Sequence, residues 1–341
     1  MRIATYNAEW MTALFDDDDQ PLYTDDWSQR YDVTKAQQLD ALGLVFQSID
    51  ADAIVVIEAP DTSRGRRALD ALEAFAARYN LRTREAVMGF PNDTQQEIAM
   101  LYDPDVLTAR HAPMGAPTGS DGRTDAPRFD CVFRIDLDID ATEDRVVFSK
   151  PPMELEVETA AGNRFRLIGT HLKSKAPHGA RTRDEAMRQS IANRRKQLAQ
   201  AIWLRQRIDQ HLEAGDPLIV LGDLNDGPGL DEYENLFGRS SVEIILGTGQ
   251  SGKLYDPHAE MALVRPFSAS PTTARFFMRH TKRYMQALLD YIMISPDLRP
   301  KAQDWRIWHP MDDPECWTND ALCKALLTAS DHFPVTLDID L

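Results

Sequence analysis

The sequence predicts an α/β protein, because short strand-like runs alternate with helical patterns along the whole chain. Each strand-like run is rich in β-branched and aliphatic residues and has a polar residue at one end. Between these runs, apolar residues recur every three or four positions, as they do on the buried face of a helix. Strands mixed with helices in this way are typical of the α/β class.

The expected strands are residues 3–6, 54–57, 167–170, 218–222, 291–294 and 335–339. The last of these alternates between apolar and polar positions with period two, as a strand with one buried face does. The expected helices are residues 36–49, 69–79 and 184–212. Since no internal repeat or long low-complexity linker interrupts this order, we expect a single domain over residues 1–341.

Two segments, residues 12–27 and 238–280, are expected to be surface insertions. The first contains Asp16-Asp17-Asp18-Asp19, which we interpret as a solvated loop, since it lacks the glycine and the terminal glutamate of an EF-hand calcium loop. The second is rich in Gly, Ser and Pro and is expected to be irregular. It could shape a substrate site or be variable surface.

The composition is that of an ordinary globular protein, with 43% hydrophobic and 27% charged residues. The net charge of −16 disfavours broad electrostatic capture of nucleic acid, although a local basic patch can offset it. Three cysteines without CxxC spacing predict reduced thiols. No apolar run reaches the roughly 18 residues of a membrane span, and the N-terminus lacks an apolar signal core, so we expect a cytoplasmic protein.

Two short motifs combine residues that suit hydrolytic chemistry. In Gly222-Asp223-Leu224-Asn225, Asp223 can hold a metal or align a water, and neutral Asn225 can donate to a phosphate oxygen. In Ser330-Asp331-His332, the imidazole can take a proton near neutral pH, and Asp290 could orient it. The alternatives are that Asp223 and Asn225 cap a turn, which Asp and Asn favour after strands, and that Asp331 and His332 form a surface pair.

Glu58 and Asn7 each follow an apolar strand. Carboxylate and amide oxygens are hard ligands that suit Mg²⁺ or Mn²⁺, and no Cys/His set typical of zinc accompanies them. His171 ends another strand, where a lone histidine is also compatible with a structural role. Since all these residues lie at strand termini, a twisted sandwich can bring them together.

The order of these motifs resembles that of the endonuclease/exonuclease/phosphatase superfamily over nearly the whole chain. The matching segments are Thr5-Tyr6-Asn7, Ile57-Glu58, Gln96-Glu97-Ile98-Ala99, Thr170-His171, Gly222-Asp223-Leu224-Asn225, Leu289-Asp290-Tyr291-Ile292 and Ser330-Asp331-His332. The resemblance implies a four-layer α/β sandwich, in which two mixed β-sheets pack face to face with helices on the outside. It also implies a divalent-metal-dependent phosphoester hydrolase of the phosphodiesterase, phosphatase or nuclease type.

The resemblance further implies which residues bind the metal and the substrate. Glu58 would be the principal ligand for Mg²⁺ or Mn²⁺, with Asn7 beside it and Asp331 as a further ligand. Asn225 would contact the phosphate. Lys150 lies where relatives usually carry a phosphate-binding arginine, and it would supply a point charge in place of a planar fork.

The same resemblance assigns the catalytic roles. Asp290 would hold His332, the base that activates water, and Asp223 would align the nucleophile. Glu97 would hold His171, which would donate to the developing charge or the leaving group. The apurinic endonuclease branch has a tyrosine at the position of His171, which argues against simple apurinic-site repair.

The substrate class stays open between small phosphoesters and nucleic acid. Residues Lys173 to Arg207 contain ten Lys and Arg against two acids, which could attract a polyanion or balance the acidic surface. Because this stretch has a single aromatic residue, Trp203, and so offers little for base stacking, we expect a small phosphodiester or phosphomonoester. Nucleic acid and then phospholipid headgroups are the alternatives, and no obligate protein partner is indicated. A catalytically dead binding scaffold is disfavoured, since every expected position of the site is filled.

Overall fold

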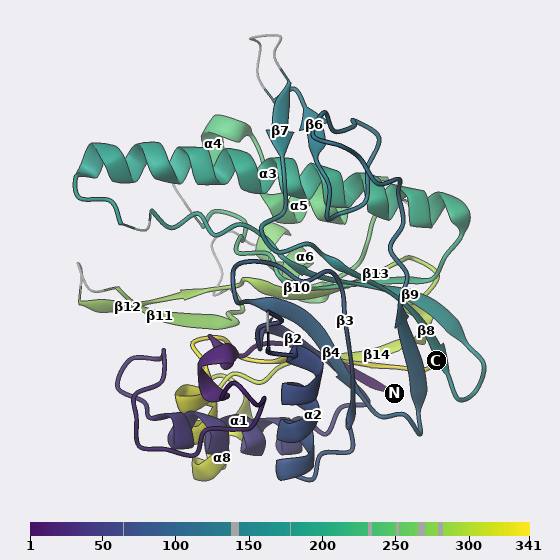
Figure 1. Ribbon diagram of the computed structural model, residues 1–341. Helices are drawn as coiled ribbons and strands as arrows, with labels where there is room; N and C mark the ends of the chain where they lie inside the picture. Colours follow the sequence, from purple (N-terminus) through teal and green to yellow (C-terminus); the bar gives the residue numbers. More distant parts are fainter. Residues whose placement is uncertain are drawn as a thin grey trace.

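The computed structural model of the chain has two β-sheets between layers of helices (Figure 1). The structure describes residues 1–63, 65–137, 143–177, 179–230, 234–249, 252–264, 270–278 and 282–341. It confirms the predicted α/β class and the sandwich of two mixed sheets.

The first sheet has six strands in the order β14-β15-β1-β2-β4-β3. Its strands are β1 (Arg2–Asn7), β2 (Ala53–Ala59), β3 (Glu85–Met88), β4 (Glu97–Tyr102), β14 (Ala302–Ile307) and β15 (Val335–Ile339). Strand β1 pairs in parallel with β2 and antiparallel with β15, so the sheet is mixed. The N-terminal and C-terminal strands are therefore neighbours at the centre of one sheet.

The second sheet has five strands in the order β13-β10-β9-β8-β5. Its strands are β5 (Leu107–His111), β8 (Met153–Thr159), β9 (Arg164–His171), β10 (Leu218–Asp223) and β13 (Asp290–Ile294). Strands β9 and β10 are parallel, and β13 runs antiparallel to β10. Two separate hairpins complete the strands: β6 (Phe133–Ile135) with β7 (Asp144–Val146), and β11 (Ala274–Met278) with β12 (Arg283–Ala287).

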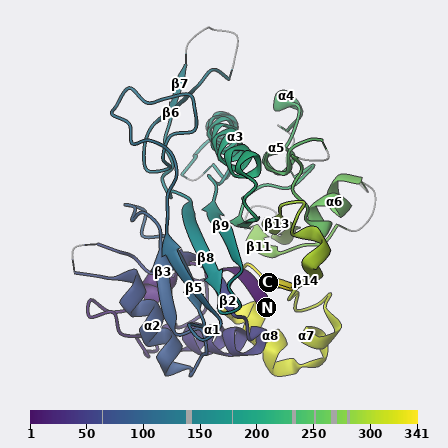
Figure 2. The same cartoon turned by 90° about the vertical axis from the view of Figure 1, so that its right-hand side faces the viewer.

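Helices cover the outer faces of both sheets (Figures 1 and 2). Under the first sheet lie α1 (Lys35–Ile49), α2 (Ala68–Arg78) and α8 (Asp320–Ala329); over the second lie α3 (Arg183–Ala214), α5 (Ser241–Leu246) and α6 (Pro257–Val264). The remaining short helices are η1 (Met11–Leu14), α4 (Glu234–Phe237), η2 (Arg299–Lys301) and α7 (Pro314–Thr318).

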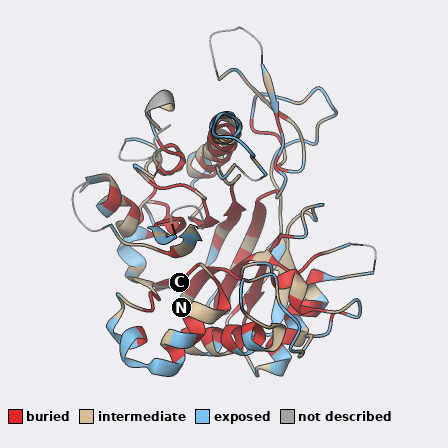
Figure 3. Ribbon diagram, turned by 90° about the vertical axis from the view of Figure 1, so that its left-hand side faces the viewer, coloured by how far each residue is buried: buried red, intermediate tan, exposed pale blue. Residues whose placement is uncertain are grey.

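Successive residues of a strand point to opposite faces, so each central strand contributes side chains to two hydrophobic cores. In β2, Ile54 and Val56 pack against the helices below, whereas Val55 and Ile57 pack against the second sheet. Because both faces of these strands are buried, their sequences are unbroken apolar runs. Buried residues concentrate between the helical layers (Figure 3).

The predicted helices begin and end within two residues of the observed ones, because their caps are encoded locally. Thr34 and Gln37 form a reciprocal capping box at the start of α1, and Thr182 and Glu185 form another at the start of α3. Gly215 ends α3 with φ 74°, a left-handed conformation that glycine adopts at low cost.

The expectation of an irregular segment at 238–280 is wrong for most of its described part. It contains α5, α6 and β11, since a Ser240–Glu243 capping box starts α5 and the β12 ladder orders β11. Residues 250–251, 265–269 and 279–280 lie outside the described residues.

The acidic run of the first insertion is only partly solvated. Asp19 is buried, and both of its carboxylate oxygens accept a hydrogen bond from the Arg67 amide. The run therefore ties its loop to the start of α2.

Across the described ranges, no helix combines the length and the apolar character that crossing a membrane requires.

Candidate active site

The polar residues at the strand termini converge on one end of the sandwich. The register pairs Asp223 of β10 with His171 of β9 on one side and with Asp290 of β13 on the other. From the first sheet, Asn7 donates through Nδ2 to Oδ2 of Asp223 at 3.1 Å, which links the two sheets. His332 lies just before β15, the antiparallel neighbour of β1, and so reaches the same end.

His332 and Asp290 form a buried dyad. Nδ1 of His332 lies 2.8 Å from Oδ2 of Asp290, and the same oxygen accepts from the Thr273 hydroxyl at 2.8 Å. Nε2 of His332 is left facing Oδ2 of Asp223, 3.9 Å away. Burial alone would lower the pKa of His332, but the carboxylates of Asp290 and Asp223 outweigh it and raise this pKa well above its ordinary value.

The turn after β10 is built by Gly222 and Asn225. A side chain at Gly222 would overlap the carbonyl of Thr170 on the neighbouring strand, so only glycine permits the close pairing of β9 and β10. Asn225 adopts φ 50°, and its amide donates to Oδ1 of Asp223 at 2.7 Å. The turn residues therefore fix the Asp223 carboxylate in place, and burial raises the pKa of this group to about 7.

A carboxylate cluster lies beside the dyad. Glu58 sits at a β-bulge with φ 59°, and its Oε2 accepts from the Trp10 amide at 2.9 Å. Oε2 of Glu9 accepts from the Asp331 amide at 2.8 Å and pairs with Arg30. The sequence analysis did not identify Glu9 as a site residue. Its position two residues after Asn7 was the only indication that it lies near the site.

The residues of this cluster fit a hard divalent cation. Glu58 and Asp331 bring carboxylates, and Asn7 brings an amide oxygen at the end of β1. Burial raises the pKa of Asp331 to about 7, and the negative charges of Glu9 and Glu58 add to that shift. Carboxylates that crowd one another in a buried place gain when a cation offsets their repulsion.

A second, more compact group of metal-type ligands lies next to it. In the part of the chain that the structure describes, Asp223, Asp290 and His332 each place one ligand atom within 4.8 Å of the others. Because Nδ1 of His332 and Oδ2 of Asp290 are already hydrogen-bonded, we interpret this trio as the proton-handling part of the site.

Lys150 lies inside the site, beside His171. Its Nζ lies 2.9 Å from Oε1 of Gln96 and 3.1 Å from Nε2 of His171. An ammonium has no lone pair and must donate both bonds. Burial lowers its pKa to about 8, although the charges of Glu58 and Asp223 oppose the shift.

His171 is poorly placed to be the acid that the resemblance implied. Burial and the adjacent Lys150 ammonium lower the pKa of His171 well below its ordinary value, so the imidazole is neutral. Its Nε2 accepts from Lys150, while its Nδ1 has no hydrogen-bond partner among the described residues. The cationic donor at this position is therefore Lys150.

The implied pairing of Glu97 with His171 is not found. Oε1 of Glu97 accepts from the amides of Asn92 and Thr62, and Oε2 accepts from the Asn92 side chain at 2.6 Å. Burial raises the pKa of Glu97 to about 7. Glu97 thus orders the loop before β4, and its neighbour Gln96, whose role the sequence did not reveal, is the residue that reaches Lys150.

The basic stretch from Lys173 to Arg207 is not a continuous surface. Arg194 is buried with 1% of its area exposed, and Arg207 is fully buried against Glu154 at 2.7 Å. Part of this positive charge therefore balances internal carboxylates, which neither of the two interpretations foresaw.

Comparisons with known proteins agree with this geometry. The family model described as "Endonuclease/Exonuclease/phosphatase family" matches residues 4–332. No curated protein matches the chain in sequence. A structure of truncated Caenorhabditis elegans TDP2 superposes with a TM-score of 0.51 at 14% identity, covering 98% of this chain and 96% of that one. An AP endonuclease from Archaeoglobus fulgidus gives a TM-score of 0.51 at 12% identity, covering 100% of both chains. At such identities these two likenesses show the fold alone.

Proposed function

Because the chain belongs to the endonuclease/exonuclease/phosphatase family, whose members are metal-dependent hydrolases of phosphoester bonds, we propose that it cleaves its substrate by in-line attack of a water that His332 deprotonates. The observation that carries this proposal is the buried dyad, in which Asp290 holds Nδ1 of His332 at 2.8 Å. Held in this way, the imidazole presents Nε2 to the reacting side. Because the carboxylates raise the pKa of His332, the base is the form of the imidazole that has first released its Nε2 proton, and Asp290 stabilises the positive charge when that proton is regained from water.

Asp223 and Asn225 position the water and the phosphate. Asp223 lies 3.9 Å from Nε2 of His332, close enough to align a water between the two groups. The Asn225 side chain donates to Oδ2 of Asp223 and to the Leu172 carbonyl, which hold it beside the site. When substrate binds, its Nδ2 would give up one of these acceptors and donate to a phosphoryl oxygen instead.

Lys150 supplies positive charge on the opposite side of the site from the dyad. Held by Gln96, its ammonium stabilises negative charge that develops on a phosphoryl or leaving oxygen. Neutral His171 orients the ammonium, since it accepts one of its protons. In this proposal Lys150 is the donor and His171 orients it, whereas the sequence led us to expect that His171 itself would be the donor.

Glu58, Asn7 and Asp331 would hold the divalent cation, Mg²⁺ or Mn²⁺. When bound, such an ion supplies Lewis-acid stabilisation of phosphoryl oxygens. The protein's part is to keep the oxygen ligands in place: the Trp10 amide binds Glu58, and Glu9 binds the Asp331 amide.

The substrate is a phosphoester, and the sequence ranks small phosphodiesters and phosphomonoesters first. A second candidate, nucleic acid, is favoured by a specific observation: a basic hairpin with exposed aromatic rings, β11–β12, contacts the dyad.

Turnover of bis-p-nitrophenyl phosphate tests the proposal. We expect hydrolysis to stop in EDTA and to return with Mg²⁺ or Mn²⁺, and His332→Ala to lower kcat by about 10²–10⁴. Full activity of the metal-stripped protein, or of His332→Ala, would refute the assignment.

A further inference from the structure

The base of the β11–β12 hairpin contacts the His332–Asp290 dyad. The Thr273 hydroxyl, just before β11, donates to Asp290 at 2.8 Å, and the Arg275 amide donates to the Asp331 carbonyl at 2.7 Å. The Phe276 ring meets the His332 imidazole edge-on at 5.5 Å. From these contacts the hairpin projects away from the sandwich (Figure 1).

One face of the hairpin carries exposed aromatic rings. Directly paired residues of an antiparallel ladder share a face, so Phe277 and Tyr284 lie side by side, with ring centroids 5.2 Å apart. Their exposed fractions are 52% and 54%, so two adjacent rings are open to a ligand. The Arg275 guanidinium stacks 3.5 Å from the centre of the Tyr284 ring.

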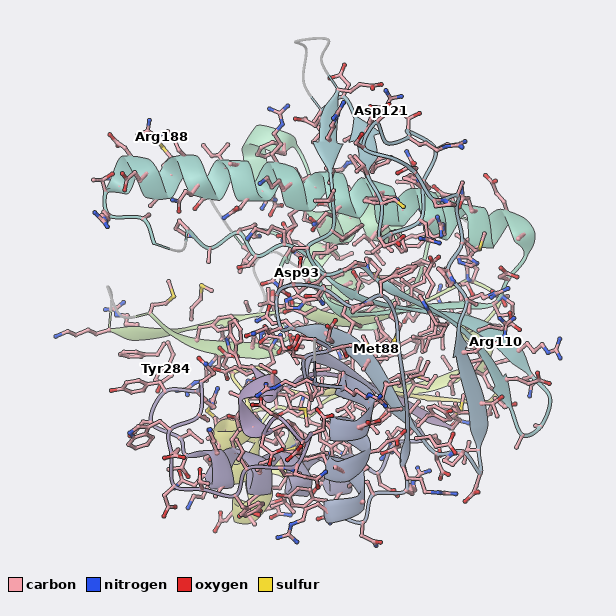
Figure 4. All side chains as sticks on the ribbon, in the orientation of Figure 1. Met88, Asp93, Arg110, Asp121, Arg188 and Tyr284 are labelled. Carbon is pink, nitrogen blue, oxygen red and sulfur yellow. The ribbon has the colours of Figure 1, made fainter. Side chains whose placement is uncertain are left out.

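The hairpin is also basic within an acidic protein. Residues 274–287 contain no Asp or Glu, whereas the whole chain has a net charge of −16. Among the described residues, Lys282 and Arg283 are exposed on this hairpin. The exposed residue Arg188 of α3 lies on the side toward which the hairpin projects (Figure 4). Positive charge therefore accompanies the exposed rings.

From these contacts we propose that β11–β12 is a binding arm for single-stranded nucleic acid, which delivers a phosphodiester of the strand to the dyad. The inference rests on the proposed phosphoester hydrolysis and names its substrate class. Aromatic rings beside cations are the combination that binds single strands, because bases stack on the rings while phosphates meet the positive charge.

The spacing along the hairpin fits this occupant. Phe277 lies two residues beyond Arg275, or about 7 Å along a strand that rises about 3.4 Å per residue. Bases in a stacked strand repeat at about the same 3.4 Å interval, so this span along the hairpin corresponds to roughly two stacked nucleotides. A duplex hides its base faces, which is why the exposed rings favour a single strand.

Binding can be measured without catalysis. We would follow the fluorescence anisotropy of a labelled ten-nucleotide single-stranded DNA with the full chain in EDTA, so that a failure of hydrolysis leaves this test intact. The variant Phe277→Leu/Tyr284→Leu keeps apolar side chains but removes the rings. We expect its affinity to fall by roughly 5- to 150-fold for each stacked base. The wild-type chain should bind the matching duplex more weakly than the single strand.

Matched controls address folding and charge. Trp317→Leu removes another exposed ring, 60% exposed on α7, and should leave the affinity unchanged. Arg283→Gln should flatten the dependence of log Kd on log salt by about 0.7 for each lost phosphate contact. Arg110→Gln, on β5 at the opposite side of the molecule (Figure 4), should not change that slope. Circular dichroism should show that the double variant is folded.

Three results would overturn the inference. One is unchanged single-strand affinity in the folded double variant; another is equal affinity for duplex and single strand. The third is a wild-type dimer that the double variant dissociates while DNA affinity stays the same, since the rings would then bind a second copy of this chain. If DNA binds as expected but no phosphoester is cleaved, the proposed reaction fails while the arm stands.

Discussion

Replacing Lys150 with methionine separates its catalytic role from its effect on stability. Lys150 has a pKa of about 8 in the folded protein, against 10.5 for an ordinary lysine. Each unit of difference is worth about 1.36 kcal/mol, so keeping this group charged costs about 3 kcal/mol at neutral pH. Because the side chain is only partly buried, we reduce this cost to roughly 2 kcal/mol. The hydrogen bonds to Gln96 and His171 return about 1–2 kcal/mol of it.

We therefore expect Lys150→Met to be as stable as the wild type at pH 7, or up to roughly 1 kcal/mol more stable. The sign depends on pH. The unfolded chain keeps the lysine proton up to a higher pH than the folded chain, so wild-type stability rises between pH 8 and 10.5. Any advantage of the variant should vanish by about pH 10. Urea unfolding of the metal-free protein at pH 7 and pH 9.5, followed by tryptophan fluorescence, measures both values.

Activity should change in the opposite direction. Loss of one preorganised donor typically lowers kcat by about 10²–10³, and turnover of bis-p-nitrophenyl phosphate tests this value. The ratio of wild-type kcat to that of Lys150→Met should fall as the pH rises through about 8, where the wild type loses the Lys150 proton. Lys301→Met, at an exposed position, serves as the control and should change neither stability nor kcat. Destabilisation of the Lys150 variant by more than about 2 kcal/mol, or unchanged kcat, would show that the ammonium is structural.

Three further predictions concern the dyad and the carboxylate cluster. Asp290→Asn and His332→Ala should each lower kcat by about 10²–10⁴, and the double variant should be little worse than the more impaired single one, since the two residues act as a unit; multiplicative losses would mean that the pair is misassigned. Glu58→Gln should weaken Mg²⁺ and Mn²⁺ binding measured by calorimetry, with unfolding of the metal-free protein unchanged; equal metal affinity would remove Glu58 from the ligand set. Glu9→Gln should lower kcat by about tenfold or more at saturating metal, because it breaks the ion pair with Arg30 while keeping an oxygen for the Asp331 amide; wild-type kcat would show that the pairing is incidental.

The parts of the site that could be predicted are those that each strand carries at its own end. A polar residue that follows an apolar run, such as Asp223 after β10, is visible in the sequence and is placed by the strand itself. The partners of these residues were not visible, because they depend on contacts between distant segments. Glu9 and Trp10 both adopt the left-handed backbone conformation, and the Glu9 side chain accepts from the Asp331 amide. No feature of the sequence predicts this conformation. The expected partner of His171 was wrong for the same reason.

The substrate ranking from the sequence considered the positive charge of residues 173–207 and did not consider that of β11–β12. Counting charges over residues 173–207 treated Arg194 and Arg207 as surface groups, although both are buried. Of the hairpin with exposed rings and cations, β11 lay in the region 238–280 that we expected to be irregular, and β12 followed it. The net charge of the chain does not decide where a polyanion binds, because at physiological salt a phosphate is affected mainly by charges within about 8 Å. A chain with a net charge of −16 can therefore hold a polyanion at one hairpin, while its acidic residues repel the rest of the strand only weakly.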